Sequence, residues 1–189
     1  MKVYFTASAR GKRSFGKYYK EIYETIADLG NRNVDDLLFK IDASDLYHGS
    51  HEDQVKLYKS ALEHIQNSDV VVLELSVHSL SMGCVMHKAL DIGKPVIALF
   101  LSKHEPYFAL GIDDEKLQVV EYDGNNLRKQ LKLAFKYSEE QMDTRFNFFI
   151  SPKIGAYLDW VSRIKRVPRA VYLRKLILDD MKHESDYEG

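Results

Sequence analysis

The sequence has few of the features that mark secreted or membrane proteins. One cysteine, Cys84, stands among 189 residues, so no disulfide can form within a single chain, which suits a reducing compartment. No apolar run approaches the roughly 18 residues that a membrane-spanning helix needs. The apolar stretch at the N-terminus is too short for a secretory signal. We therefore expect a cytoplasmic protein with no membrane partner.

The sequence also lacks a large excess of charge of either sign. Its formal net charge is −1, from 27 Lys and Arg against 28 Asp and Glu. The residues from Thr144 onward are more basic, with nine Lys and Arg against six Asp and Glu. With 45% apolar and 29% charged residues, the composition is that of a globular protein. No cluster of residue types predicts a metal or a cofactor.

Strand and helix patterns alternate over residues 1–140. Apolar runs predict strands at 2–8, 69–75, 94–100 and 117–122, with a shorter one at 37–41. Helical spacing is found at 17–30, 51–68, 81–93 and 125–142. The alternation predicts an α/β domain, flavodoxin-like or Rossmann-like, with a mostly parallel sheet and helices on both faces. Ligands of such sheets bind beyond the carboxyl ends of the strands.

Two loops at that edge carry residues suited to an anion. In "TASARG", Ser8 offers a hydroxyl and Arg10 a guanidinium whose fork matches phosphate. In "SLSMG", Ser79, Ser81 and Gly83 could form a second hydroxyl-rich cradle. The alternatives are a solvated basic turn for the first loop and an ordinary helix cap for the second. The two loops together favour a ligand site more than either does alone.

Three blocks in order and spacing resemble the nucleoside 2-deoxyribosyltransferase family, in particular its 2'-deoxynucleoside 5'-monophosphate N-glycosidase branch. They are "VYFTASARG", "LEHIQNSDVVVLEL" and "SLSMGCVMHKALDIGKPVIALF", within about residues 1–135. The resemblance implies a flavodoxin-like fold, frequent oligomers and a nucleotide held by both loops. The nucleotide-binding positions that it implies are Tyr4, Ser8, Arg10, Gly11, Ser79 and Gly83, with Ser81 where a glycine is common.

The same resemblance also shows that this sequence lacks the family's catalytic carboxylates. The family's nucleophilic glutamate falls on Val85, and a second family carboxylate falls on Ala61. An oxocarbenium-like centre needs a nearby carboxylate, which neither side chain supplies. Glu74, near the end of a predicted strand, is the remaining acid that could act in their place. We therefore expect a pocket that binds without turnover, and we keep a glycosidase or transferase using Glu74 as the alternative.

A second module is predicted at 143–189. An alternating segment at 145–150 precedes two helical patterns, an order that resembles the ribbon-helix-helix class of dimeric DNA-binding proteins. The resemblance implies that Arg145, Asn147 and Phe149 face base edges and that the helix start near Arg169 holds a DNA phosphate. The alternative is a helical hairpin used only for assembly.

Together these features predict a regulator. A catalytically inactive nucleotide-binding domain would act as sensor, and a homodimeric or larger assembly would bind double-stranded DNA through its C-terminal module. The rivals are an active nucleotide N-glycosidase or transferase and a structural oligomer that does not bind DNA.

Overall fold

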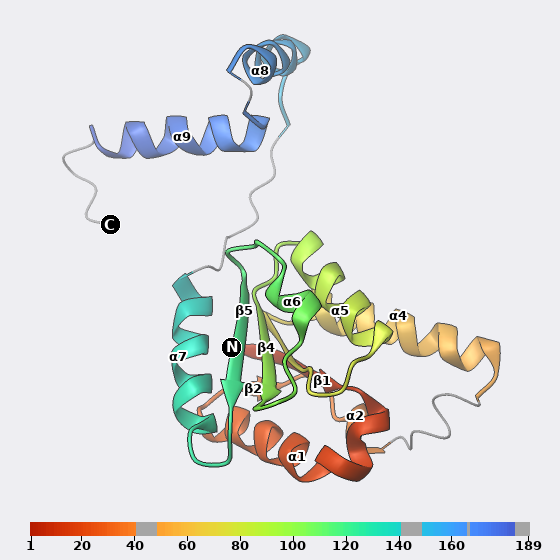
Figure 1. Ribbon diagram of the computed structural model, residues 1–189. Helices are drawn as coiled ribbons and strands as arrows, with labels where there is room; N and C mark the ends of the chain where they lie inside the picture. The colour runs from red at the N-terminus through yellow and green to blue at the C-terminus, as the bar shows by residue number, and fades with distance from the viewer. Residues whose placement is uncertain (41–48, 141–148, 166, 184–189) are drawn as a thin grey trace. The chain divides into compact units, whose positions relative to one another are not determined.

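The computed structural model describes residues 1–40, 49–140, 149–165 and 167–183, and Figure 1 shows the chain. The chain divides into two compact units, Met1–Asp143 and Thr144–Gly189. The first unit holds the sheet and its helices, and the described ranges of the second hold two helices.

The first unit is built on a five-stranded sheet in which every strand pairing is parallel. The strands are β1 (Lys2–Ala7), β2 (Arg32–Asn33), β3 (Val70–Glu74), β4 (Val96–Leu101) and β5 (Leu117–Tyr122). Their order across the sheet is β2-β1-β3-β4-β5. This is the flavodoxin-like order, in which the direction of winding changes between β1 and β3. The predicted α/β fold class is confirmed.

Helices connect the strands. They are α1 (Lys12–Asp28), α2 (Leu37–Lys40), α4 (His51–Asn67), α5 (Leu80–Asp91), α6 (Tyr107–Leu110) and α7 (Leu127–Glu140), with a 3-10 turn η1 at Ala9–Gly11. Ser50 begins α4 by accepting a hydrogen bond from the N–H of Asp53 at 3.2 Å. The chain leaves α1 through Gly30 and α5 through Gly93, both at a positive φ that favours glycine.

Both faces of the sheet are buried, as a parallel sheet requires. On one face, α1 and α7 cover alternate strand residues such as Val70 and Val72. On the other face, α4 and α5 cover Val71 and Leu73. All five residues of β3 are buried, which explains why its sequence is an unbroken apolar run until Glu74.

Two local predictions were wrong. Residues 37–40 form the helical turn α2, not a strand, and the neighbour of β1 at this edge is the two-residue strand β2. The helix predicted at 17–30 begins earlier, at Lys12, directly after the 3-10 turn η1 that follows β1.

The second unit consists, in its described ranges, of α8 (Pro152–Lys165) and α9 (Arg169–Met181). Both helices form where the apolar spacing predicts them, and a proline stands at the start of each. Their contact buries Leu158, Val161 and Tyr172. The Ser162 hydroxyl donates a hydrogen bond of 2.8 Å to the carbonyl of Val167 and so helps to close the turn.

Candidate ligand-binding site

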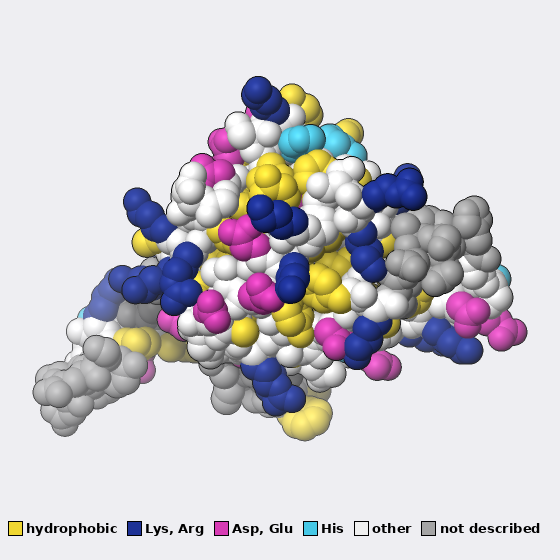
Figure 2. All heavy atoms as spheres, turned by 90° about the horizontal axis from the view of Figure 1, so that it is seen from below, with side chains coloured by type: hydrophobic (Ala, Val, Ile, Leu, Met, Phe, Trp, Pro, Cys, Tyr) yellow, Lys and Arg dark blue, Asp and Glu magenta, His cyan; other side chains and the backbone are white. Residues whose placement is uncertain are grey.

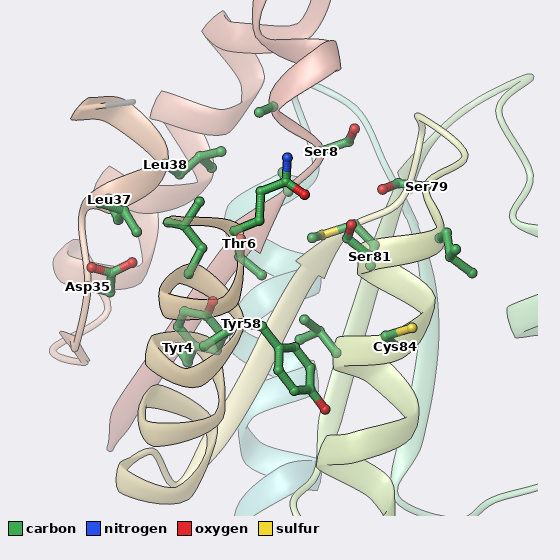
Figure 3. A pocket seen from close by; sticks show the side chains of 18 residues that line it. Tyr4, Thr6, Ser8, Asp35, Leu37, Leu38, Tyr58, Ser79, Ser81 and Cys84 are labelled. Atoms are coloured by element: carbon green, nitrogen blue, oxygen red, sulfur yellow. The ribbon is translucent and has the colours of Figure 1, made fainter. Parts of the chain in front are cut away.

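A cavity of about 390 Å³ opens at the carboxyl ends of β1 and β3, where the strand order reverses. Its walls come from β1, the residues after β2, α4 and the start of α5 (Figure 3). The lining residues are Tyr4, Thr6, Ala7, Ser8, Ala9, Asp35, Leu37, Leu38, Gln54, Leu57, Tyr58, Ala61, Ser79, Leu80, Ser81, Met82, Cys84 and Val85. A volume of this size suits a small organic ligand.

Two serine hydroxyls in the cavity wall are buried without a hydrogen-bond partner in the described part of the chain. Ser8, 2% exposed, stands before η1, and Ser79 stands before α5. Neither side chain caps its helix, although each occupies a capping position. The Oγ atoms of both residues are unsatisfied, and Figure 3 shows both side chains among those that line the cavity. A buried hydroxyl without a partner is costly, so this arrangement is typical of a site that a polar ligand completes.

The cavity brings together four of the seven residues predicted to bind a nucleotide. Tyr4, Ser8, Ser79 and Ser81 line it. The other three, Arg10, Gly11 and Gly83, are not among its lining residues. A Cβ atom at Gly11 would lie 2.0 Å from the Tyr19 hydroxyl oxygen, so this glycine makes room for a core tyrosine.

Basic residues are spread over this end of the unit. Figure 2 views the protein from below Figure 1, the end toward which β4 and β5 run, and shows Lys and Arg interspersed with Asp and Glu. Arg10 is exposed on η1, while Lys12 and Arg13 lie in the first turn of α1. The basic side chains do not gather into a single patch on this face.

The positions that the family resemblance links to catalytic carboxylates do face the cavity. Val85, 8% exposed, and Ala61 both belong to its lining. They lie on α5 and α4, whose apolar faces cover the same side of the sheet. At these two points the wall is therefore hydrocarbon, which can neither trap nor stabilise a positive charge at a sugar carbon.

Glu74 does not line the cavity. Its Oε1 accepts hydrogen bonds from the Ser76 N–H (3.3 Å), the Ser76 hydroxyl and the Tyr122 hydroxyl (3.4 Å). Glu74 follows Val70 and Val72 in the alternation along β3, on the face covered by α1 and α7. Burial raises its pKa above the usual value, although the bonds from Ser76 and Tyr122 oppose that shift. The structure does not bring this acid to the ligand site.

Asp35 is a site residue that the sequence reasoning missed. It follows β2 and is the acidic residue among the described residues that line the cavity. Its Oδ1 lies 3.7 Å from Nε2 of His64 on α4. The sequence reasoning placed a short strand at 37–41 and assigned no role to the two aspartates that precede it.

Tyr4 forms the floor of the cavity between this carboxylate and α4. Its ring lies 5.4 Å from the His64 ring, centroid to centroid. Burial raises the pKa of Tyr4 to about 12, a hydrogen bond with Thr6 opposes the shift, and the charge of Asp35 adds to it. Tyr4 therefore keeps its proton at neutral pH and offers the cavity a neutral hydroxyl and an aromatic face.

The residues predicted to read DNA lie largely beyond the described ranges. Arg145 and Asn147 fall in 141–148, outside them. Phe149 is described; it is fully exposed and, like Ile150, not part of a strand, so the predicted strand does not extend over these two positions. Arg169, in the first turn of α9, pairs with Asp159 of α8.

Neither a metal site nor a membrane-spanning helix is found in the described ranges. No group of three or more His, Cys, Asp or Glu side chains there is arranged to hold a metal ion. Among the same residues, no helix combines the length and apolar character needed to cross a membrane.

The order of the strands and the position of the cavity define the first unit as a flavodoxin-like α/β domain with a site at its switch point. Among solved structures, the chain is similar to the CMP N-glycosidase BcmB of Clostridium botulinum. The TM-score is 0.51 and the identity 16%, over 70% of this chain and 98% of that one. The likeness is one of fold. The chain matches no family model and no curated protein.

Proposed function

We propose that the first unit binds a nucleotide or a nucleoside-like ligand without breaking its glycosidic bond. The observation that carries the proposal is the pair of buried, unpartnered hydroxyls of Ser8 and Ser79 in one cavity. Each stands before a helical turn, where backbone N–H groups also favour an anion. The apolar walls beside them suit a sugar and a base.

The absence of turnover is proposed from the cavity wall. Val85 and Ala61, at the family's carboxylate positions, supply no carboxylate, and Glu74 belongs to the opposite face of the sheet. Asp35, the acid among the described lining residues, follows β2 and stands at neither of these two positions. The resemblance of the two loops to a nucleotide-binding family, together with a neighbour of related fold named as a CMP N-glycosidase, makes CMP the first ligand to try.

Isothermal titration of the full chain with CMP tests binding. We expect the double variant Ser8→Ala/Ser79→Ala to bind CMP at least about tenfold more weakly. It loses two hydrogen bonds to the ligand, each worth about 1 kcal/mol. Its thermal midpoint should not fall, because neither hydroxyl has a hydrogen-bond partner among the described residues. The exposed Ser14→Ala variant in α1 is the matched control. Equal affinity for CMP in the double variant and in wild type would contradict the proposal.

Chromatography of the same mixtures tests the absence of turnover. We expect CMP to remain intact after long incubation with the wild-type protein. Cytosine release that the Ser8→Ala/Ser79→Ala variant abolishes would make the protein a glycosidase and overturn that half of the proposal.

For the second unit, we propose pairing with a second copy and binding of double-stranded DNA. Residues 145–175 contain eight Lys and Arg and one acid, and the helices α8 and α9 follow the alternating segment along the chain. Ligand binding in the first unit would then act on a DNA-bound assembly.

A further inference from the structure

Asp35 is held in the cavity wall by the backbone around it. Two residues earlier, Asn33 pairs with Val3 of β1, and the N–H of Val34 donates a 2.9 Å hydrogen bond to the carbonyl of Val3. Val34 then packs into the core on the cavity side of the sheet. The side chain of Asp35 is 16% exposed, so the cavity contains a carboxylate that is largely screened from bulk water.

A histidine on α4 supports this carboxylate from the side. His64 Nε2 lies 3.7 Å from Asp35 Oδ1 and 3.1 Å from the Ser60 hydroxyl. An ionised carboxylate has about four acceptor positions, so one neighbour at this distance leaves room for donors from a ligand. The next residue behaves differently: the Asp36 carboxylate pairs with Lys40 at 2.7 Å and does not line the cavity.

The cavity thus has two polar ends, one that favours hydrogen-bond acceptors of a ligand and one that favours donors. Ser8 and Ser79 lie at one end and Asp35 at the other (Figure 3). In this view Leu38 lies between the two ends and Tyr58 lies to one side. The serine end can donate hydrogen bonds to an anion. The aspartate end can only accept hydrogen bonds when ionised, and it repels an anion or a carbonyl oxygen.

We propose that Asp35 determines specificity for a nucleoside monophosphate whose base carries an exocyclic amino group. This inference rests on the proposed ligand-binding function. The phosphate would lie toward the serines and the base toward Asp35, where an amino group donates to the carboxylate. A base with a carbonyl oxygen at the same position would place two acceptors against each other, and a buried carboxylate left without its donor is costly.

Titration of the full-length protein with CMP and UMP tests this assignment. The two bases differ at the exocyclic position, an amino group against a carbonyl oxygen, and at the adjacent ring nitrogen, an acceptor in CMP and an N–H donor in UMP. We expect CMP to bind at least about tenfold more tightly than UMP, the effect of one hydrogen bond to a charged group. AMP and IMP form a second pair with the same difference. Asp35→Asn should reduce the preference to about twofold, since an amide can donate as well as accept.

Asp36→Asn is the matched control, since it removes the same charge one residue away from the cavity, and its CMP-to-UMP ratio should stay at the wild-type value. If neither nucleotide binds to the wild-type protein, the proposed function fails and this inference with it. Tight but equal binding of CMP and UMP to the wild-type protein leaves the function standing and overturns the role of Asp35, whether or not the variants fold. An equal loss of preference in Asp36→Asn would also overturn it, by showing a general effect of charge.

Discussion

Glu74 is a buried acid whose environment makes the stability of the protein depend on pH. Burial raises its pKa in the folded protein above the value of 4.5 expected in an unfolded chain. The folded state therefore holds this proton more tightly than the unfolded state does. Its contribution to stability is fully present below pH 4.5 and is lost as pH rises toward the folded pKa.

The variant Glu74→Gln isolates this effect. We expect its free energy of unfolding, relative to wild type, to increase as pH rises above the usual glutamate pKa, by at most about 1.4 kcal/mol per pH unit for one proton. Guanidinium unfolding of both proteins between pH 4 and 8 measures the difference. Glu121→Gln, at an exposed position of β5, is the control and should follow wild type. A difference for Glu74→Gln that stays constant or shrinks with rising pH would contradict the raised pKa.

At the scale of single residues, the sequence predicted which side chains could bind a ligand better than it predicted which way a side chain points. Ser8 and Ser79 were found because small hydroxyl residues follow apolar runs that had to be strands. The orientation of Glu74 was not found, because it depends on the register of β3 between two covered faces and not on the type of residue. Asp35 was missed for a related reason: its position is set by a two-residue strand that is too short to leave a pattern.

Among the elements, the junction of β1 and α1 depends on one glycine. Gly11 has a helical φ of −77°, so its conformation is open to any residue. The space around Gly11, however, admits no larger residue, since an added Cβ would lie 2.0 Å from the Tyr19 hydroxyl oxygen and 2.9 Å from a Val77 methyl. That hydroxyl donates a 3.3 Å hydrogen bond to the carbonyl of Ser8. Gly11 therefore lets α1 begin directly against the strand edge that carries the cavity serine.

We expect Gly11→Ala to destabilise the protein by about 1–3 kcal/mol, the usual cost of overpacking a core. Gly16→Ala is the matched control in the same helix, because nothing lies within 4 Å of its added Cβ. It should stabilise the protein by about 0.5–1 kcal/mol through helix propensity. Thermal denaturation followed by circular dichroism compares the two. Equal effects of both substitutions would show that helix propensity, and not the contact with Tyr19, sets the cost at position 11.

At the scale of the whole molecule, alternation of strands and helices was enough to predict the α/β class. The order of the strands was not contained in that pattern, since it depends on which edge each crossover takes. The second unit shows another limit of the pattern. Apolar spacing located α8 and α9 but could not say what covers the apolar side chains that their mutual contact leaves exposed.

Those side chains lead to the last prediction, which concerns assembly. In the described ranges of the second unit, the core is limited to three buried residues, while Ile164 and Ile177 are 64% and 60% exposed. A unit this small gains stability by pairing with a second copy. In a pair related by a two-fold axis, the same residue is buried in both copies. Each isoleucine would contribute about 1.5–3 kcal/mol when buried. Ile164→Glu/Ile177→Glu should therefore weaken self-association at least about 100-fold, measured by sedimentation equilibrium of the full chain.

Arg163→Glu, an exposed neighbour on α8, controls for the added charge and should leave the dimer intact.

The same samples test the DNA proposal, because paired modules that contact several phosphates lose affinity steeply with salt. The wild-type protein should bind duplex DNA with such a dependence, Arg145→Ala should weaken that binding, and the double glutamate variant should bind far more weakly. A wild-type protein that sediments as a monomer would contradict the pairing. A dimer without affinity for DNA would limit the second unit to assembly.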